Sequence, residues 1–215
     1  MKKSRLSLLN LSVLFVSIFL TSSSLFAQGR VGMTILETDG VSLSGVSTLF
    51  AIDPLAQSLC FQDGGYGHVF QDNQVKNRCS DINYNSYQAG GFSVGIEGRR
   101  EGVIIDLGTR ADLSKRYGYE ETVGAGQGFA SITKADGKIY ILQNRREQNT
   151  QALSESSALF NKPDSSLNSV PVVLGHIYIL RITDGIDQNF ERIVKLIVIA
   201  HSPNESVTFR WQELK

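Results

Sequence analysis

Alternation of apolar and polar positions dominates the chain. Residues 92–96 read FSVGI, with an apolar side chain at every second position, and residues 103–107 repeat this period. A period of two is typical of a strand that buries one face. The segment EGRREG between them is charged, flanked by glycine and of hairpin length. The pattern therefore predicts two antiparallel strands over residues 92–107.

Further strand pairs follow along the chain. QGFASIT and KIYILQ flank an Asp136-Gly137 pair, which suits a tight turn with positive backbone φ angles. HIYILRITD and ERIVKLIVIA are apolar and β-branched enough to be central strands, with turn residues between them. Val207, Phe209 and Trp211 then share one face of a last strand. We expect an antiparallel meander over residues 176–213.

Only two segments have a helical pattern. Residues 109–118 begin with a capping threonine, carry an acid three residues later and end at a glycine. Residues 150–161 place Leu153 and Phe160 on one side of a helix that stops before Pro163. Many short strands with two short helices predict an all-β or β-rich α+β fold, built as an antiparallel sandwich or a barrel-like sheet.

The pattern of the first residues predicts an export signal. Basic residues near Met1 precede a mostly apolar run over residues 6–20 and then small residues, which is the order of a secretory signal peptide. The run is interrupted by serines and an asparagine, and it is shorter than the roughly 20 apolar residues of a membrane-spanning helix. We expect cleavage after Ala27, with a cut after Ser24 as the alternative. We also expect a single β-rich domain over residues 28–215 and no transmembrane span after cleavage.

Loss of the signal changes the charge balance. It removes three basic residues and no acidic ones, which leaves 18 Lys and Arg against 21 Asp and Glu, a formal charge of −3. Nucleic-acid-binding domains normally carry a basic face that replaces the counterions of the phosphates. The composition therefore argues against a nucleic-acid partner.

The chain has two cysteines, Cys60 and Cys79. In an exported protein they are expected to pair, because the compartments outside the inner membrane are oxidising. A bond across a loop of this size stabilises the fold by about 3 kcal/mol in the chain-entropy model. The bond is therefore expected for stability alone, whether or not the loop holds a site.

Two loops are candidate binding surfaces. The loop between the cysteines would be ordered before a ligand arrives, so it would lose less entropy on binding. A second loop follows the first predicted helix, and its aromatic faces and carboxylates suit a sugar or a cation. The candidate binding residues are Asp63, Tyr66, His68, Asp72, Tyr117, Tyr119, Glu120 and Glu121.

Catalytic and metal sites are weaker alternatives. GFSVG matches the G-x-S-x-G pattern of serine hydrolases, and Asp106 with His176 or His201 would complete the chain order of a triad around Ser93. That elbow needs a strand-to-helix turn, whereas Ser93 lies inside an alternating strand. The histidine spacing predicts no zinc site. No cofactor is predicted.

Calcium is the one metal alternative. Asp63, Asp72 and Asn73, with Asp81 nearby, supply the hard oxygen ligands that calcium prefers. Their spacing fits no EF-hand loop, and Asp and Asn are also ordinary turn residues.

These patterns favour binding over catalysis. The first hypothesis is an exported bacterial β-sheet module for binding or adhesion, with surface loops that contact a protein or a glycan in the periplasm, at the cell surface or in the medium. The alternatives are a secreted hydrolase that uses Ser93 or loop carboxylates such as Glu120 and Glu121, and a structural envelope protein without a small ligand.

Overall fold

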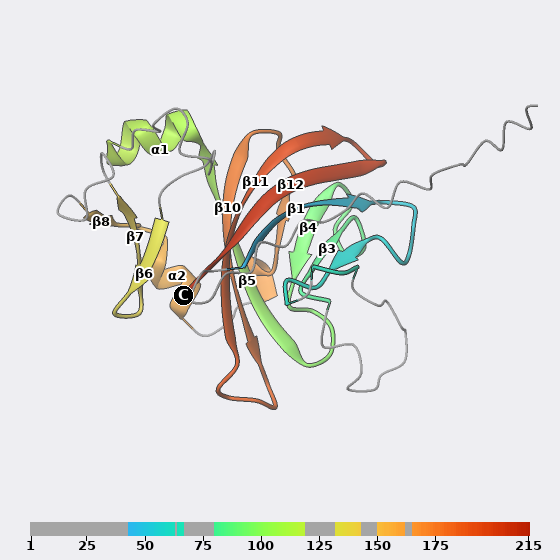
Figure 1. Cartoon of the computed structure of the whole chain (residues 1–215), viewed down its shortest axis with the longest axis horizontal. Helices are drawn as coiled ribbons and strands as arrows, with labels where there is room; N and C mark the ends of the chain where they lie inside the picture. The colour runs from blue at the N-terminus through green and yellow to red at the C-terminus, as the bar shows by residue number, and fades with distance from the viewer. Residues whose placement is uncertain (1–42, 63, 67–79, 119–131, 143–149, 162–164) are drawn as a thin grey trace, which may run out of the picture. The chain divides into compact units, whose positions relative to one another are not determined.

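In the part of the chain that the structure describes, the strands form three antiparallel sheets, accompanied by two short α-helices and one 3₁₀ helix (Figure 1). A computed structural model describes residues 43–62, 64–66, 80–118, 132–142, 150–161 and 165–215, all within the unit Val31–Lys215. This architecture confirms the predicted β-rich fold class, in its sandwich-like form.

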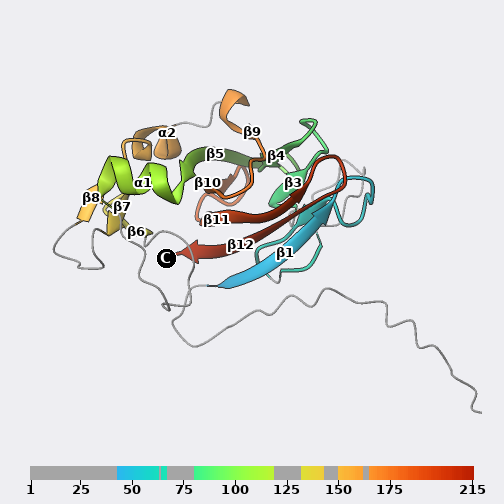
Figure 2. The same ribbon diagram turned by 90° about the horizontal axis from the view of Figure 1, so that it is seen from above.

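The largest sheet has five strands in the order β1-β12-β11-β10-β5. Its last three strands along the chain are antiparallel neighbours, joined by the turns that the sequence pattern placed between them. Figure 2 shows β1, β12 and β11 side by side, as their pairing requires. The strands are β1 (Ser44–Phe50), β5 (Arg100–Thr109), β10 (His176–Asp184), β11 (Glu191–Ser202) and β12 (Ser206–Leu214).

A four-stranded sheet in the order β2-β3-β4-β9 packs on one face of the main sheet. The core between them contains the side chains of Val207, Phe209 and Trp211, on the face that the alternation predicted. The Trp211 indole contacts the Phe61 ring edge-on at 5.0 Å and donates a hydrogen bond to Ser47. The strands of this sheet are β2 (Ser58–Leu59), β3 (Ile82–Tyr84), β4 (Gly91–Val94) and β9 (Ser169–Pro171).

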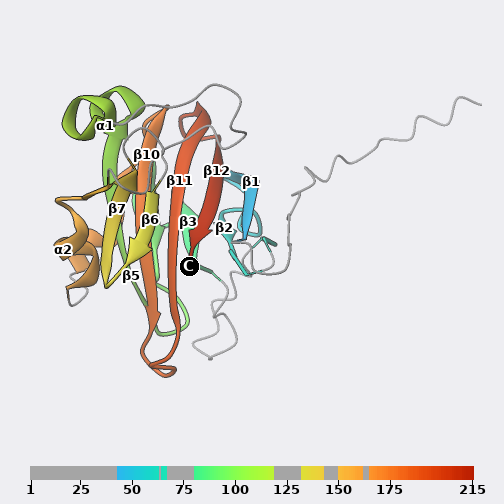
Figure 3. The same ribbon diagram turned by 60° about the vertical axis from the view of Figure 1, so that its left-hand side comes forward.

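The opposite face of the main sheet carries a second core. The helices and the sheet β6-β7-β8 contribute to it, and Figure 3 shows them on the other side of β10 and β11 from β2 and β3. β11 is therefore buried on both faces, which explains its nearly continuous apolar sequence. The elements are α1 (Arg110–Tyr117), β6 (Ile132–Ala135), β7 (Lys138–Leu142), β8 (Thr150–Ala152), α2 (Ser156–Phe160) and the short 3₁₀ helix η3 (Ser165–Leu167).

The predicted pairing within residues 92–107 is wrong. Both strands exist, but β4 belongs to the four-stranded sheet and β5 to the main sheet. Gly95, Gly98 and Arg99 between them all have positive φ angles near 60°, so the chain bends from one sheet into the other instead of forming a hairpin. A side chain on Gly95 would also lie within 2.4 Å of the Gly102 backbone nitrogen.

Two other local predictions have different outcomes. β6 and β7 form the predicted hairpin, and Asp136 and Gly137 have the expected positive φ angles. The helix predicted over residues 150–161 is largely wrong, because Thr150–Ala152 pairs with β7 as a strand and only Ser156–Phe160 is helical. Residues 150–152 gain backbone hydrogen bonds by pairing with the edge of β7. This pairing stabilises the strand more than the weak helix propensity of this polar segment stabilises a helix.

Candidate functional site

An aspartate and a histidine meet where β5 lies beside the start of β10. The Nδ1 atom of His176 lies 2.9 and 3.0 Å from the two carboxylate oxygens of Asp106. A register shift between Ile177 and Tyr178 accompanies this arrangement of the two antiparallel strands. Because the carboxylate accepts a hydrogen at Nδ1, a neutral His176 ring has its lone pair at Nε2.

The chain turns directly from β5 into α1 at this point. Gly108 has a φ angle of +79°, and its backbone N–H donates to Asp106 Oδ1 at 2.7 Å. Thr109 then caps α1, since its hydroxyl accepts from the backbone of Asp112 while the Asp112 carboxylate accepts from the backbone of Thr109. The predicted start and end of this helix, with Gly118 in the left-handed conformation at its C-terminus, are confirmed.

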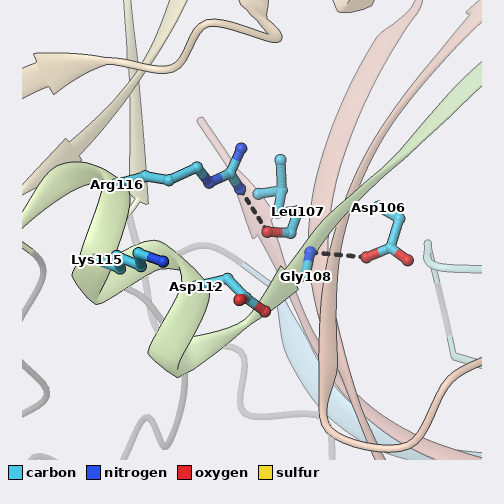
Figure 4. A pocket seen from close by; sticks show the side chains of 6 residues that line it. All are labelled: Asp106, Leu107, Gly108, Asp112, Lys115 and Arg116. Atoms are coloured by element: carbon cyan, nitrogen blue, oxygen red, sulfur yellow. Dashed lines mark hydrogen bonds between the residues drawn. The ribbon is translucent and has the colours of Figure 1, made fainter.

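A pocket of about 640 Å³ lies between the end of β5 and α1 (Figure 4). Arg116 is held there by two hydrogen bonds, one to the carbonyl of Leu107 at 2.5 Å and one to the Glu155 carboxylate at 2.6 Å. The six residues that line the pocket are Asp106, Leu107, Gly108, Asp112, Lys115 and Arg116.

Hydrogen bonds lower the pKa of two acids at this pocket, Asp112 and Glu155. The bonds from Thr109 lower the pKa of Asp112, and the nearby His176 and Arg116 lower it further. Burial raises the pKa of Glu155, but hydrogen bonds from Ser154 and Arg116 outweigh it, so that this pKa is lowered overall. The pocket therefore has charged carboxylates in and beside it at neutral pH.

Tyr117 is part of the core instead of the surface. Its side chain is 5% exposed, and its hydroxyl bonds to Ser154 and to the Glu155 carboxylate. This position leaves little of its ring for a ligand. The three other predicted binding residues of this loop, Tyr119, Glu120 and Glu121, lie outside the described residues.

The three residues of the alternative triad are only partly brought together. Asp106 and His176 are paired, whereas Ser93 is 1% exposed and its hydroxyl lies 3.0 Å from that of Ser169. Ser93 is on β4 of the other sheet, where this hydrogen bond accounts for a buried hydroxyl. His201 lies elsewhere and contacts the Tyr84 hydroxyl at 3.1 Å, and burial lowers its pKa.

Little of the cysteine loop is described. Tyr66 is 43% exposed and pairs through its backbone with Leu59, while Cys60 is buried. The pairing of the two cysteines stays a prediction. The residues of this loop that lie outside the described part are Asp63, His68, Asp72, Asn73 and Cys79.

Asp81, just after this loop, forms an ion pair with an arginine. Its carboxylate is fully buried and lies 2.7 Å from the guanidinium of Arg192. It also accepts a hydrogen bond from the backbone of Phe61. Among the residues that the structure describes, no three His, Cys, Asp or Glu side chains are grouped to hold a metal ion.

Sequence reasoning missed the pocket. It recognised Thr109 and Asp112 as a helix start, but not that this start borders a pocket shared with Asp106. Lys115 and Arg116 carry no motif of their own. One signal in the sequence could have indicated it: a polar helix of two turns directly follows a buried strand. This order places charged side chains of the helix at the end of the strand.

Comparisons with known proteins assign no family to this arrangement. The chain matches no family model, no curated protein and no solved structure. In the described part of the chain, no helix has the length and apolar character needed to cross a membrane.

Proposed function

We propose that the protein is an exported module that binds a protein or glycan partner at the pocket between β5 and α1. The observation that supports this proposal is the group of polar side chains already held in place there by hydrogen bonds. Side chains fixed before binding lose less conformational entropy when a ligand arrives, so the same contacts give a tighter complex. A rigid sheet that presents such a site at the end of a strand is a common design for recognition.

A photo-crosslinking amino acid tests where the partner contacts the protein. It replaces the exposed Ser114 on α1, which is next to the pocket residue Lys115, and in a matched control it replaces the exposed Lys138 on β7. We expect a cross-link to one partner from position 114 that excess unmodified protein abolishes, and none from position 138. Equal labelling at both positions, or none at 114, contradicts the proposal.

Export and the disulfide belong to the same proposal. The mature protein recovered from its native cell is expected to begin at Gln28, which N-terminal sequencing measures. The intact mass of the unreduced protein is expected to be lower by two hydrogen atoms than that of the reduced protein, because Cys60 and Cys79 are bonded. Recovery of residues 1–27 in the mature chain, or a free-thiol signal from the folded protein, contradicts these expectations.

The Asp106–His176 hydrogen bond favours a hydrolase as a second candidate function. An imidazole that is oriented by a carboxylate is a common general base. Here the base would be His176, oriented by Asp106, and it would activate water. A panel of ester and glycoside substrates tests this candidate with His176→Asn and, as a control, His201→Asn. If the protein is a hydrolase of this kind, we expect turnover that His176→Asn abolishes and that His201→Asn leaves unchanged. Absence of turnover, or equal losses in both variants, excludes this role for the pair.

A further inference from the structure

We propose that the pocket between β5 and α1 binds a neutral carbohydrate. This inference rests on the proposed binding function and specifies its ligand. The charges of the pocket, its hydrogen-bonding groups and its order before binding lead to this assignment.

The charges around the pocket oppose an anionic ligand. The lining contains two carboxylates, Asp106 and Asp112, and two cations, Lys115 and Arg116, so it has no net positive charge. Both cations of the lining are exposed, and Arg116 already forms an ion pair with Glu155 at 2.6 Å. A phosphate or a sulfated glycan would therefore gain no net attraction there, while Lys115 and Arg116 offset much of the attraction of the carboxylates for a cationic ligand.

The available hydrogen-bonding groups match hydroxyl groups. Both bonds that Thr109 donates to the Asp112 carboxylate reach Oδ2, so Oδ1 keeps its lone pairs. Lys115 presents only donors, whereas a carboxylate presents only acceptors. A sugar hydroxyl donates and accepts at once, and neighbouring hydroxyls on one ring can therefore satisfy a carboxylate and an ammonium group together.

The two carboxylates of the pocket, which accept hydrogen bonds, are held in place before a ligand binds. Gly108 and His176 hold Asp106 in place, and the capping hydrogen bonds hold Asp112. A Cβ atom at position 108 would lie 2.9 Å from Asp112 Oδ2, so the close approach of β5 to α1 depends on this glycine. The carboxylates thus keep their spacing without a ligand, which reduces the entropy lost when hydroxyl groups bind.

Saturation-transfer NMR and calorimetry with defined oligosaccharides test the assignment. The probes are neutral oligomers of glucose and of N-acetylglucosamine, compared with a sulfated and an amino-sugar oligomer of equal length. The variants are Lys115→Ala and the matched control Lys138→Ala, both at exposed lysines. We expect saturable binding of a neutral oligomer that weakens about tenfold in Lys115→Ala, since a hydrogen bond from a charged group is lost, and that is unchanged in Lys138→Ala.

The outcomes separate this inference from the proposed function. Binding of only the sulfated or only the amino-sugar oligomer overturns the neutral assignment. Binding that Lys115→Ala does not weaken places the sugar elsewhere and also overturns it. If no oligosaccharide binds but a partner cross-links from position 114, the carbohydrate assignment fails and the binding module stands. If neither is observed, both fail.

Discussion

Lys195 shows how one residue can make stability depend on pH. Its side chain is 2% exposed and lies on the β11 face that carries Ile193 and Ile197. Burial, with a smaller effect from Arg210, lowers its pKa to about 7. Burial disfavours the charged form, so the folded protein binds fewer protons at this residue than the unfolded chain does between about pH 7 and pH 10.

We therefore expect Lys195 to make the fold more stable as pH rises through this window. The stabilisation is complete above the pKa of the unfolded chain and is lost as pH falls through about 7. Its size is at most about 5 kcal/mol, given roughly 1.4 kcal/mol for each pH unit between the two pKa values. Urea denaturation between pH 6 and pH 10 should show the rise in the wild type and a smaller rise in Lys195→Met. Equal slopes for the two proteins would contradict the prediction.

Among the elements, α1 connects the strand, the core and the pocket. The helix has only eight residues, and isolated helices of this length are not stable in water. Leu113 and Tyr117 pack into the core beside β5, while the capping residues close its first turn. Its position, and with it the geometry of Asp112 and Arg116, therefore depends on both packing and capping.

Loss of the cap should be measurable in the stability of the whole fold. Thr109→Ala removes the side chain that accepts from the Asp112 backbone, and we expect it to lower the free energy of unfolding by about 1 kcal/mol. Ser114→Ala, at an exposed position of the same helix, is the control and should be neutral or slightly stabilising. Chemical denaturation measures both variants. A loss in Ser114→Ala as large as that in Thr109→Ala would remove the cap as the explanation.

In the whole molecule, a buried ion pair joins the two larger sheets. Asp81 immediately precedes β3 of the four-stranded sheet, and its partner Arg192 lies on β11 of the main sheet. Arg192 also bonds to Glu213 on β12. Burial raises the pKa of Asp81 while Arg192 lowers it, with burial the larger effect. Excellent geometry is required at such a site, because each charge has been removed from water.

We expect Asp81→Ala to cost about 3–5 kcal/mol, because it leaves the Arg192 charge buried without this partner. The double variant Asp81→Leu with Arg192→Met should lose less free energy of unfolding than the sum of the losses in the two single variants. Glu101→Ala, at an exposed position of β5, serves as the control and should change stability by less than about 0.5 kcal/mol. Additive effects in the double variant would show that the pair does not couple the sheets.

Sequence reasoning recovered the local features of the fold and part of the site. The strands of the C-terminal half, the Asp136-Gly137 turn and the capped helix all depend on neighbouring residues, so their patterns are visible along the chain. The separation of β4 from β5 is not visible, because the alternation of a strand does not specify its partner. For the same reason the weak helical pattern over residues 150–152 gave way to pairing with β7.

The sequence by itself determined that the chain is β-rich, where most strands of its C-terminal half lie and that α1 starts at Thr109. Only the tertiary structure decided that Asp106 meets His176 while Ser93 lies in another sheet, and that Asp112 and Arg116 border one pocket with Asp106. Periodicity and capping act over a few residues, so the sequence displays them directly. The meeting of residues 70 positions apart depends instead on which strands pair, and burial and hydrogen bonding across the whole fold decide that pairing.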